Sequence, residues 1–150
     1  MARLDYYGLM KEMQDILELS TSLDGVQIAI EEEEPYGPDN TPFIGISIPE
    51  RSSPIELQRI AAGRKQSYLI VFSIWCWCFD FESKPSAIRN RDDLLGTVEV
   101  ELMKEAARTL NGKVESGRID GGELSTATLD GVGFFSGGEI KFIAEATASY

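Results

Sequence analysis

One stretch of this sequence constrains the fold more than any other: from Tyr68 to Phe79, every residue except Ser73 is apolar. Alternate residues of a β-strand point to opposite faces of the sheet. One face of a strand over 66–81 would carry Ile70, Phe72, Ile74, Cys76 and Cys78. The other face would carry Leu69, Val71, Trp75, Trp77 and Phe79. Because both faces are apolar, the pattern predicts a central strand that is covered on both sides.

The length of this strand also predicts an oligomer. About 14 residues of this strand, at about 3.3 Å each, already span about 46 Å. A globular chain of 150 residues is only about 40 Å across. The strand must therefore bend sharply or protrude from the body of the protein. A protruding strand usually needs a neighbouring subunit to cover it.

The rest of the sequence indicates a single domain, residues 1–150, of the α+β class. Apolar spacings predict helices over 4–19 and 86–110 and further strands over 26–30, 43–48, 113–119 and 139–149. The order is α-β-β-β-α-β-β. We expect a mainly antiparallel sheet of about four to five strands with two helices packed on one face. The glycine-rich stretch before the last strand is predicted to be a loop or short hairpin, and residues 49–65 an extended loop or arm.

The charge of the chain narrows its partners. The chain has 14 basic and 25 acidic residues, a formal net charge of −11 and a pI of about 4.4. Affinity for nucleic acid or an anionic membrane comes mainly from Lys and Arg. The composition disfavours binding to nucleic acid and to an anionic membrane, but it permits a surface along which DNA passes without binding. The longest apolar run is too short to cross a bilayer as a helix, and the first residues lack a signal-peptide core, so we expect no export.

The residues needed for common catalytic and metal sites are missing. The chain has no histidine, which excludes Ser-His-Asp and Cys-His catalysis and histidine metal sites. We therefore expect neither an enzyme nor a cofactor. Cys76 and Cys78 could be a redox pair or half of a metal site, but two thiolates cannot complete a tetrahedral zinc shell. Positions i and i+2 of a strand are poorly placed for a disulfide, so we expect two buried packing residues.

Three clusters of charge are candidate sites. The acidic run Glu31, Glu32, Glu33 and Glu34 is either a cation site, a docking patch for a basic partner, or a solvated loop. Asp92 and Asp93 could mimic a catalytic acid pair, although acids early in a helix also complement its dipole. The basic cluster consists of Arg51, Arg59, Arg64 and Lys65. It is small for a nucleic-acid site and suits contact with an acidic neighbour.

Taken in order, these elements resemble the tail terminator proteins of long-tailed bacteriophages, also called tail completion or minor tail proteins. The resemblance covers nearly the whole chain and lies in element order more than in a signature. It rests on the helix over 4–19, Thr41-Pro42-Phe43-Ile44, the strand over 67–81, the run Arg89 to Leu95, and the closing pattern Gly133-Phe134-Phe135 to Ile143.

The resemblance implies a hexameric ring in the virion, at the head-proximal end of the tail tube, assembled in the host cytoplasm. Such a ring stops tube polymerisation and joins the tail tube protein to a neck or head-closure protein. DNA passes through its lumen without specific binding. In this interpretation, residues 49–65 dock on a neighbouring ring through their basic side chains.

Two other kinds of function also fit the sequence. A head-closure or neck protein, or a tail tube subunit, would share the ring and the acidic lumen, but a tube subunit would polymerise into long tubes. A small-molecule-binding or enzymatic domain would use Asp92, Asp93 and the glycine-rich loop.

Overall fold

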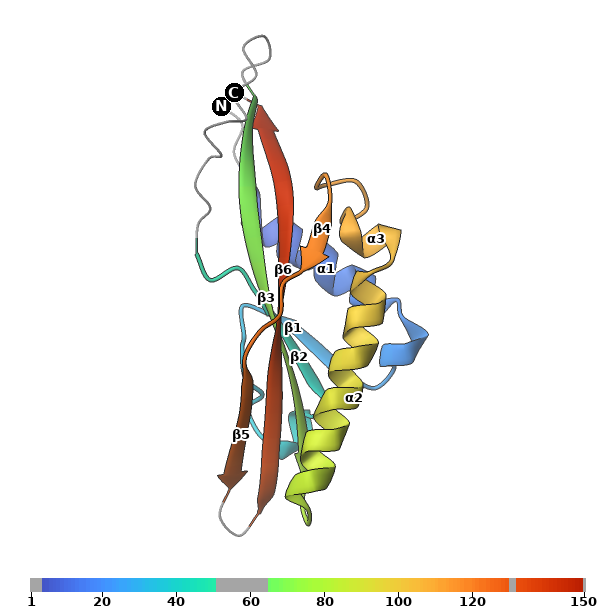
Figure 1. The fold of residues 1–150 in the computed structure, drawn as a ribbon, viewed down its shortest axis with the longest axis vertical. Helices are drawn as coiled ribbons and strands as arrows, with labels where there is room; N and C mark the ends of the chain where they lie inside the picture. The colour runs from blue at the N-terminus through green and yellow to red at the C-terminus, as the bar shows by residue number, and fades with distance from the viewer. Residues whose placement is uncertain (1–3, 51–64, 130–131, 150) are drawn as a thin grey trace.

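The computed structural model describes residues 4–50, 65–129 and 132–149 (Figure 1). It confirms the α+β class and a mainly antiparallel sheet. The helices are α1 (Tyr6–Glu18), α2 (Lys84–Leu102) and α3 (Glu105–Arg108), with short 3-10 turns at Thr21–Leu23 and Pro38–Asn40. The strands are β1 (Gln27–Ile30), β2 (Phe43–Ser47), β3 (Lys65–Asp80), β4 (Gly117–Ile119), β5 (Leu124–Leu129) and β6 (Gly133–Ser149).

The six strands form one sheet in the order β1-β2-β3-β6-β4, with β5 pairing a separate stretch of β6. β1 and β2 are parallel, and the other pairs are antiparallel. The sheet therefore has six strands where about four to five were expected. The additional strand, β5, lies in the glycine-rich stretch that was predicted to be a loop or short hairpin, and it forms a hairpin with the start of β6.

The sheet is built around a long ribbon made of β3 and β6. Their pairing runs without a break from Lys65 opposite Ser149 to Asp80 opposite Phe134. β2 pairs only with residues 73–77 of β3, and β4 only with residues 142–144 of β6. Figure 1 shows that the end of the ribbon that carries Lys65 extends past the helices. Of the two expected alternatives, a sharp bend or a protruding strand, Figure 1 shows the protruding strand.

The core lies between one face of this sheet and the helices. The even-numbered face of β3 is fully buried at Ile70, Phe72, Ile74 and Cys76. On this side of the sheet, α1 packs over β1 and β2, and α2 packs over β3 and β6. Asp5 caps the first of these helices, because its side chain accepts a hydrogen bond from the Gly8 N–H at 2.9 Å. The prediction that the helices pack on one face is confirmed.

The second helix differs from its prediction. A single helix over 86–110 was expected, but α2 ends at Leu102 and a separate short helix, α3, follows. Lys104 between them has an extended backbone. This break redirects the chain, and Ala107 and Leu110 join Leu102 in the core.

The glycine-rich stretch forms β5 and the start of β6 because large neighbours occupy the space above its glycines. A Cβ at Gly137 would lie 2.6 Å from the ring of Trp77, its partner across the ribbon. A Cβ at Gly138 would lie 2.5 Å from the Leu95 side chain on α2. These glycines are required for close packing against the sheet, and they do not mark a loop.

The second face of β3 is not covered as expected. In the part of the chain that the structure describes, all helices pack on the even-numbered face. On the odd-numbered face, Leu69 is 45% exposed, and Val71, Trp75 and Phe79 are only partly buried. An apolar pattern on both faces indicated two covering layers, but it could not indicate whether the second layer comes from the same chain.

Candidate interaction surface

Aromatic side chains form a row along the uncovered side of the sheet, which we call the open face. Trp75 and Trp77 of β3 are stacked, with ring centroids 5.7 Å apart and planes 19° apart. Phe79 continues the row and lies 4.8 Å, between ring centroids, from both Phe135 and Phe81. Phe81 is 70% exposed. Trp75, Phe79 and Phe135 are partly buried, and only 7% of Trp77 is exposed. A partly exposed aromatic row that ends in an exposed ring is a candidate interaction surface.

The glutamates of residues 31–34, the acidic loop, are held beside this row. Gly45 lies opposite Trp75 in the β2–β3 register and therefore faces the same side. A Cβ at Gly45 would clash with the backbone carbonyl of Glu32, so only glycine lets the loop cross β2 this closely. The Trp77 indole Nε1–H donates to the Glu33 carbonyl oxygen at 2.8 Å. Together, Gly45 and Trp77 fix the acidic loop against the open face.

A pocket separates the acidic loop from β5. Its volume is about 200 Å³, and it is lined by Glu34, Pro35, Trp77, Ser125, Ala127 and Phe135. We call it the rim pocket. Sites for small molecules usually measure about 300–1,000 Å³, so this pocket is better matched to a single side chain. Its aromatic walls and the Glu34 carboxylate suit a cation, which binds aromatic faces and carboxylates together.

The charge of the acidic loop is not neutralised within residues 4–50, 65–129 and 132–149. The ion pairs in these ranges join Lys11 to Asp15, Arg91 to Asp92, Lys104 to Glu101 and Lys113 to Glu12. The Tyr36 hydroxyl donates to Glu32 Oε1 at 2.7 Å, which orders the loop but leaves its charge. Within the same ranges, no group of three metal-ligating side chains comes together.

The basic candidates do not lie beside the acidic ones in the described structure. Lys65 begins β3 at the protruding end of the ribbon, whereas the rim pocket lies near Trp77, toward the other end. Arg51, Arg59 and Arg64 lie outside the described residues. The expectation that residues 49–65 form a docking arm stays a prediction.

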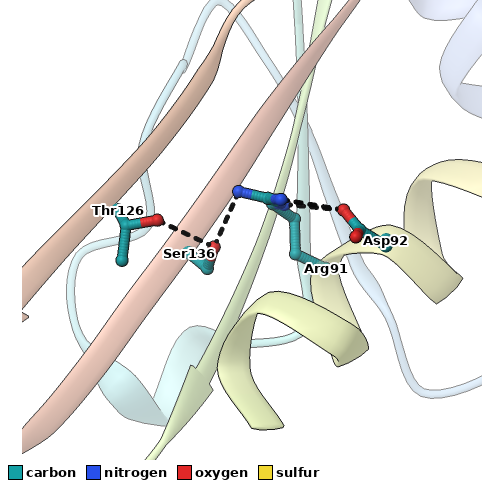
Figure 2. Close-up of polar contacts among 4 residues, drawn as sticks. All are labelled: Arg91, Asp92, Thr126 and Ser136. Carbon is teal, nitrogen blue, oxygen red and sulfur yellow. Dashed lines mark hydrogen bonds and ion pairs between the residues drawn. The ribbon is translucent and has the colours of Figure 1, made fainter. Parts of the chain in front are cut away.

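Asp92 belongs to a polar network that the sequence interpretation missed (Figure 2). Asp92 Oδ1 accepts from Arg91 Nε at 3.0 Å and from Arg91 Nη2 at 2.9 Å. Arg91 Nη1 donates to the buried Ser136 hydroxyl at 3.0 Å, and that oxygen lies 3.3 Å from the Thr126 hydroxyl. The network ties α2 to β6 and β5.

The position of Asp92 and Asp93 also corrects their interpretation. α2 begins at Lys84, so both acids lie in its third turn, beyond the reach of the helix dipole at the N-terminus. Asp92 neutralises Arg91 instead. The signal that could have revealed this is the position of Arg91 four residues after Ala87 and three before Leu94, inside the buried stripe of the helix.

Cys76 and Cys78 lie in the core, on the helix-covered face, as predicted. Burial raises the pKa of the Cys76 thiol far above its usual range. Burial, followed by the nearby charge of Asp93, raises the pKa of Cys78 to about 11. Both thiols are therefore held in the neutral, unreactive form near neutral pH.

These thiols predict a pH dependence of stability. A thiol whose pKa is higher in the folded than in the unfolded protein favours the folded state. This contribution is fully present at pH values below the unfolded pKa, near 9.0. For Cys78, this contribution is lost as the pH rises through about 11. Chemical denaturation should show the wild type to be more stable than the Cys76→Ala/Cys78→Ala variant by about 1–2 kcal/mol per site near neutral pH.

That advantage should shrink above the unfolded pKa, by up to about 1.4 kcal/mol per pH unit for each thiol. Comparing the two proteins at each pH cancels the titration of Tyr and Lys. A difference that stays constant as the pH rises toward about 11 would contradict the burial of the thiols. Stoichiometric zinc in the purified protein would contradict their packing role.

Among the residues that the structure describes, none of the helices combines the length and the apolar composition needed to cross a membrane.

Comparison with protein-family models gives no match for this chain, and neither does comparison with curated protein sequences.

Proposed function

We propose that this chain is a structural ring subunit of a long-tailed phage, of the tail terminator kind. In this role, a ring of about six copies sits at the head-proximal end of the tail tube and stops its growth. The ring joins the tube to the neck and encloses the path of the DNA. The order of the elements supports the proposal through the resemblance described above.

The open face is the observation that carries this proposal. Apolar side chains on the long ribbon remain partly exposed in a single copy, with Leu69 at 45%, and apolar surface of this kind is stabilised when a partner covers it. A contact between copies is heterologous when it joins two different surfaces of the chain. The open face differs from the helix face, so a contact that joins the open face of one copy to another surface of the next is heterologous. Heterologous contacts close into rings when the rotation between copies permits.

The net charge of −11 fits a ring around DNA. An acidic lumen repels phosphates, so DNA would pass through it without binding. A neck protein or a tube subunit would share this property, so charge does not separate the candidates. Their modes of assembly do separate them, because a terminator stops at one ring.

The proposal predicts that the purified protein binds one end of a tail tube. Tail tubes of the same phage would be mixed with the protein and imaged by negative stain. We expect a single ring at one end and no further lengthening when free tube protein is added. Long tubes formed by this chain alone would identify a tube subunit, and tubes that keep growing at both ends would contradict the proposal.

A further inference from the structure

We propose that the rim pocket receives an arginine from residues 51–64 of a second copy of this chain. This inference rests on the proposed ring and names the contact between its subunits. One copy supplies the pocket formed by Glu34, Trp77 and Phe135, and the next copy supplies Arg59 or Arg64.

Charge complementarity within the chain identifies the occupant. Residues 51–65 contain Arg51, Arg59, Arg64 and Lys65, and their single acidic residue is Glu56. This basic segment lies in a chain whose net charge is −11, and the acidic loop is a run of four glutamates. Opposite charges on two parts of one surface attract in the contact between copies, where they speed encounter and fix the register.

The chemistry of the rim pocket favours a guanidinium group. The Trp77 N–H is already used by the Glu33 carbonyl oxygen, and only 7% of this residue is exposed, so Trp77 contributes a small apolar part of the pocket wall. Phe135 offers a second aromatic wall, and the Glu34 carboxylate accepts hydrogen bonds. Arginine stacks on aromatic faces and bonds a carboxylate with the same planar group, which lysine cannot do.

The length of the chain indicates that this contact forms between copies. Lys65 lies 12 positions from Trp77 along β3, which corresponds to about 40 Å. Arg59 is six residues from Lys65, and six extended residues span at most about 22 Å. This span is shorter than the distance from Lys65 to Trp77, so chain length favours a contact with another copy.

The two halves of the contact thus lie toward opposite ends of the same ribbon. The basic segment enters β3 at the protruding end, and the rim pocket lies toward the other end. A contact from the end of one copy to the pocket of the next is head-to-tail, and repeated head-to-tail contacts generate a ring or a filament. The rim pocket and the basic segment together would link each copy to two neighbours.

Charge reversal tests the contact. One full-length variant carries Glu33→Lys and Glu34→Lys, and the other carries Arg59→Glu and Arg64→Glu. Both glutamates are exposed, so their replacement should preserve the fold. Sedimentation and native mass spectrometry at low salt should show self-association of the wild type that weakens as salt is added. Each variant alone should associate about tenfold more weakly or worse.

Mixing the two variants distinguishes a contact between copies from one within a copy. In an alternating assembly, every Lys-bearing pocket meets a Glu-bearing segment, and every native pocket meets a native segment. An equimolar mixture should therefore recover association and contain equal numbers of both variants. A contact within one copy would be recovered only when all four substitutions are placed in the same chain, and that pattern would overturn the proposal.

The matched control for the Glu33→Lys and Glu34→Lys variant is Glu18→Lys with Glu99→Lys, which makes the same change of net charge at two exposed helix positions. Its association should match or exceed that of the wild type. Wild-type association in both reversed variants, or no self-association of the wild type, would overturn the pocket contact. If the reversed variants associate like the wild type but still form rings at tube ends, the proposed function stands and the pocket contact does not. If self-association changes as expected but the wild type does not bind tube ends, the contact stands and the proposed function does not.

Discussion

Replacing Gly45 with alanine is expected to lower the free energy of unfolding by about 3 kcal/mol, a large cost for one methyl group. The new Cβ would overlap the carbonyl group of Glu32, so the backbone of the acidic loop would have to move away from β2. That movement would break the hydrogen bond from Trp77 to Glu33. Denaturant unfolding measures the loss of stability.

Tryptophan fluorescence reports the movement directly, because Trp75 and Trp77 are the two tryptophans of the chain. We expect Gly45→Ala to shift the emission of the folded protein. The matched control is Gly96→Ala in α2, where nothing lies within 4 Å of the new Cβ. It should stabilise the protein by about 1 kcal/mol through helix propensity. Unchanged stability and emission in Gly45→Ala would contradict the placement of the acidic loop.

Replacing Asp92 with alanine is expected to destabilise the protein by about 3 kcal/mol, although the Asp92 side chain is 58% exposed. Its partner Arg91 is only 7% exposed, and the loss of Asp92 would leave that cation buried with the Ser136 hydroxyl as its remaining hydrogen-bond partner among the described residues. Removing one partner of a buried charge costs more than the pair itself contributes. Denaturant unfolding measures the difference.

Two further variants separate this effect from a general loss of charge. Asp93→Ala removes an equally charged, exposed neighbour and should change stability by less than about 0.5 kcal/mol. Arg91→Met combined with Asp92→Ala removes both charges and should recover most of the loss. Equal losses for Asp92→Ala and Asp93→Ala, or a double variant less stable than Asp92→Ala, would show that Arg91 does not depend on Asp92.

The sequence predicted those parts of the fold in which the residue pattern is compatible with only one secondary structure. The alternation from Leu69 to Phe79 defined β3 and its length, and the apolar spacing from Leu4 to Leu17 defined α1. The first part of β6 was placed in a loop or short hairpin because glycine has no side chain to show a pattern. Gly137 and Gly138 occupy strand positions only because Trp77 and Leu95 fill the space above them.

The candidate site was only partly predictable for a related reason. The four glutamates are evident in the sequence, but their place depends on long-range partners, Gly45 and Trp77. The open face was misread because an apolar residue such as Leu69 is compatible with cover from its own chain or from another. Arg91 was missed because a charge inside an apolar stripe is recognised only when its partners are known.

A reconstruction of the virion that contains this chain tests the account most directly, because it gives both the position and the copy number of the protein. We predict a single ring of about six copies at the head-proximal end of the tail tube, with the open face of each copy covered by its neighbour. A single copy per particle, or a position away from the junction of tail and neck, would contradict the proposed function.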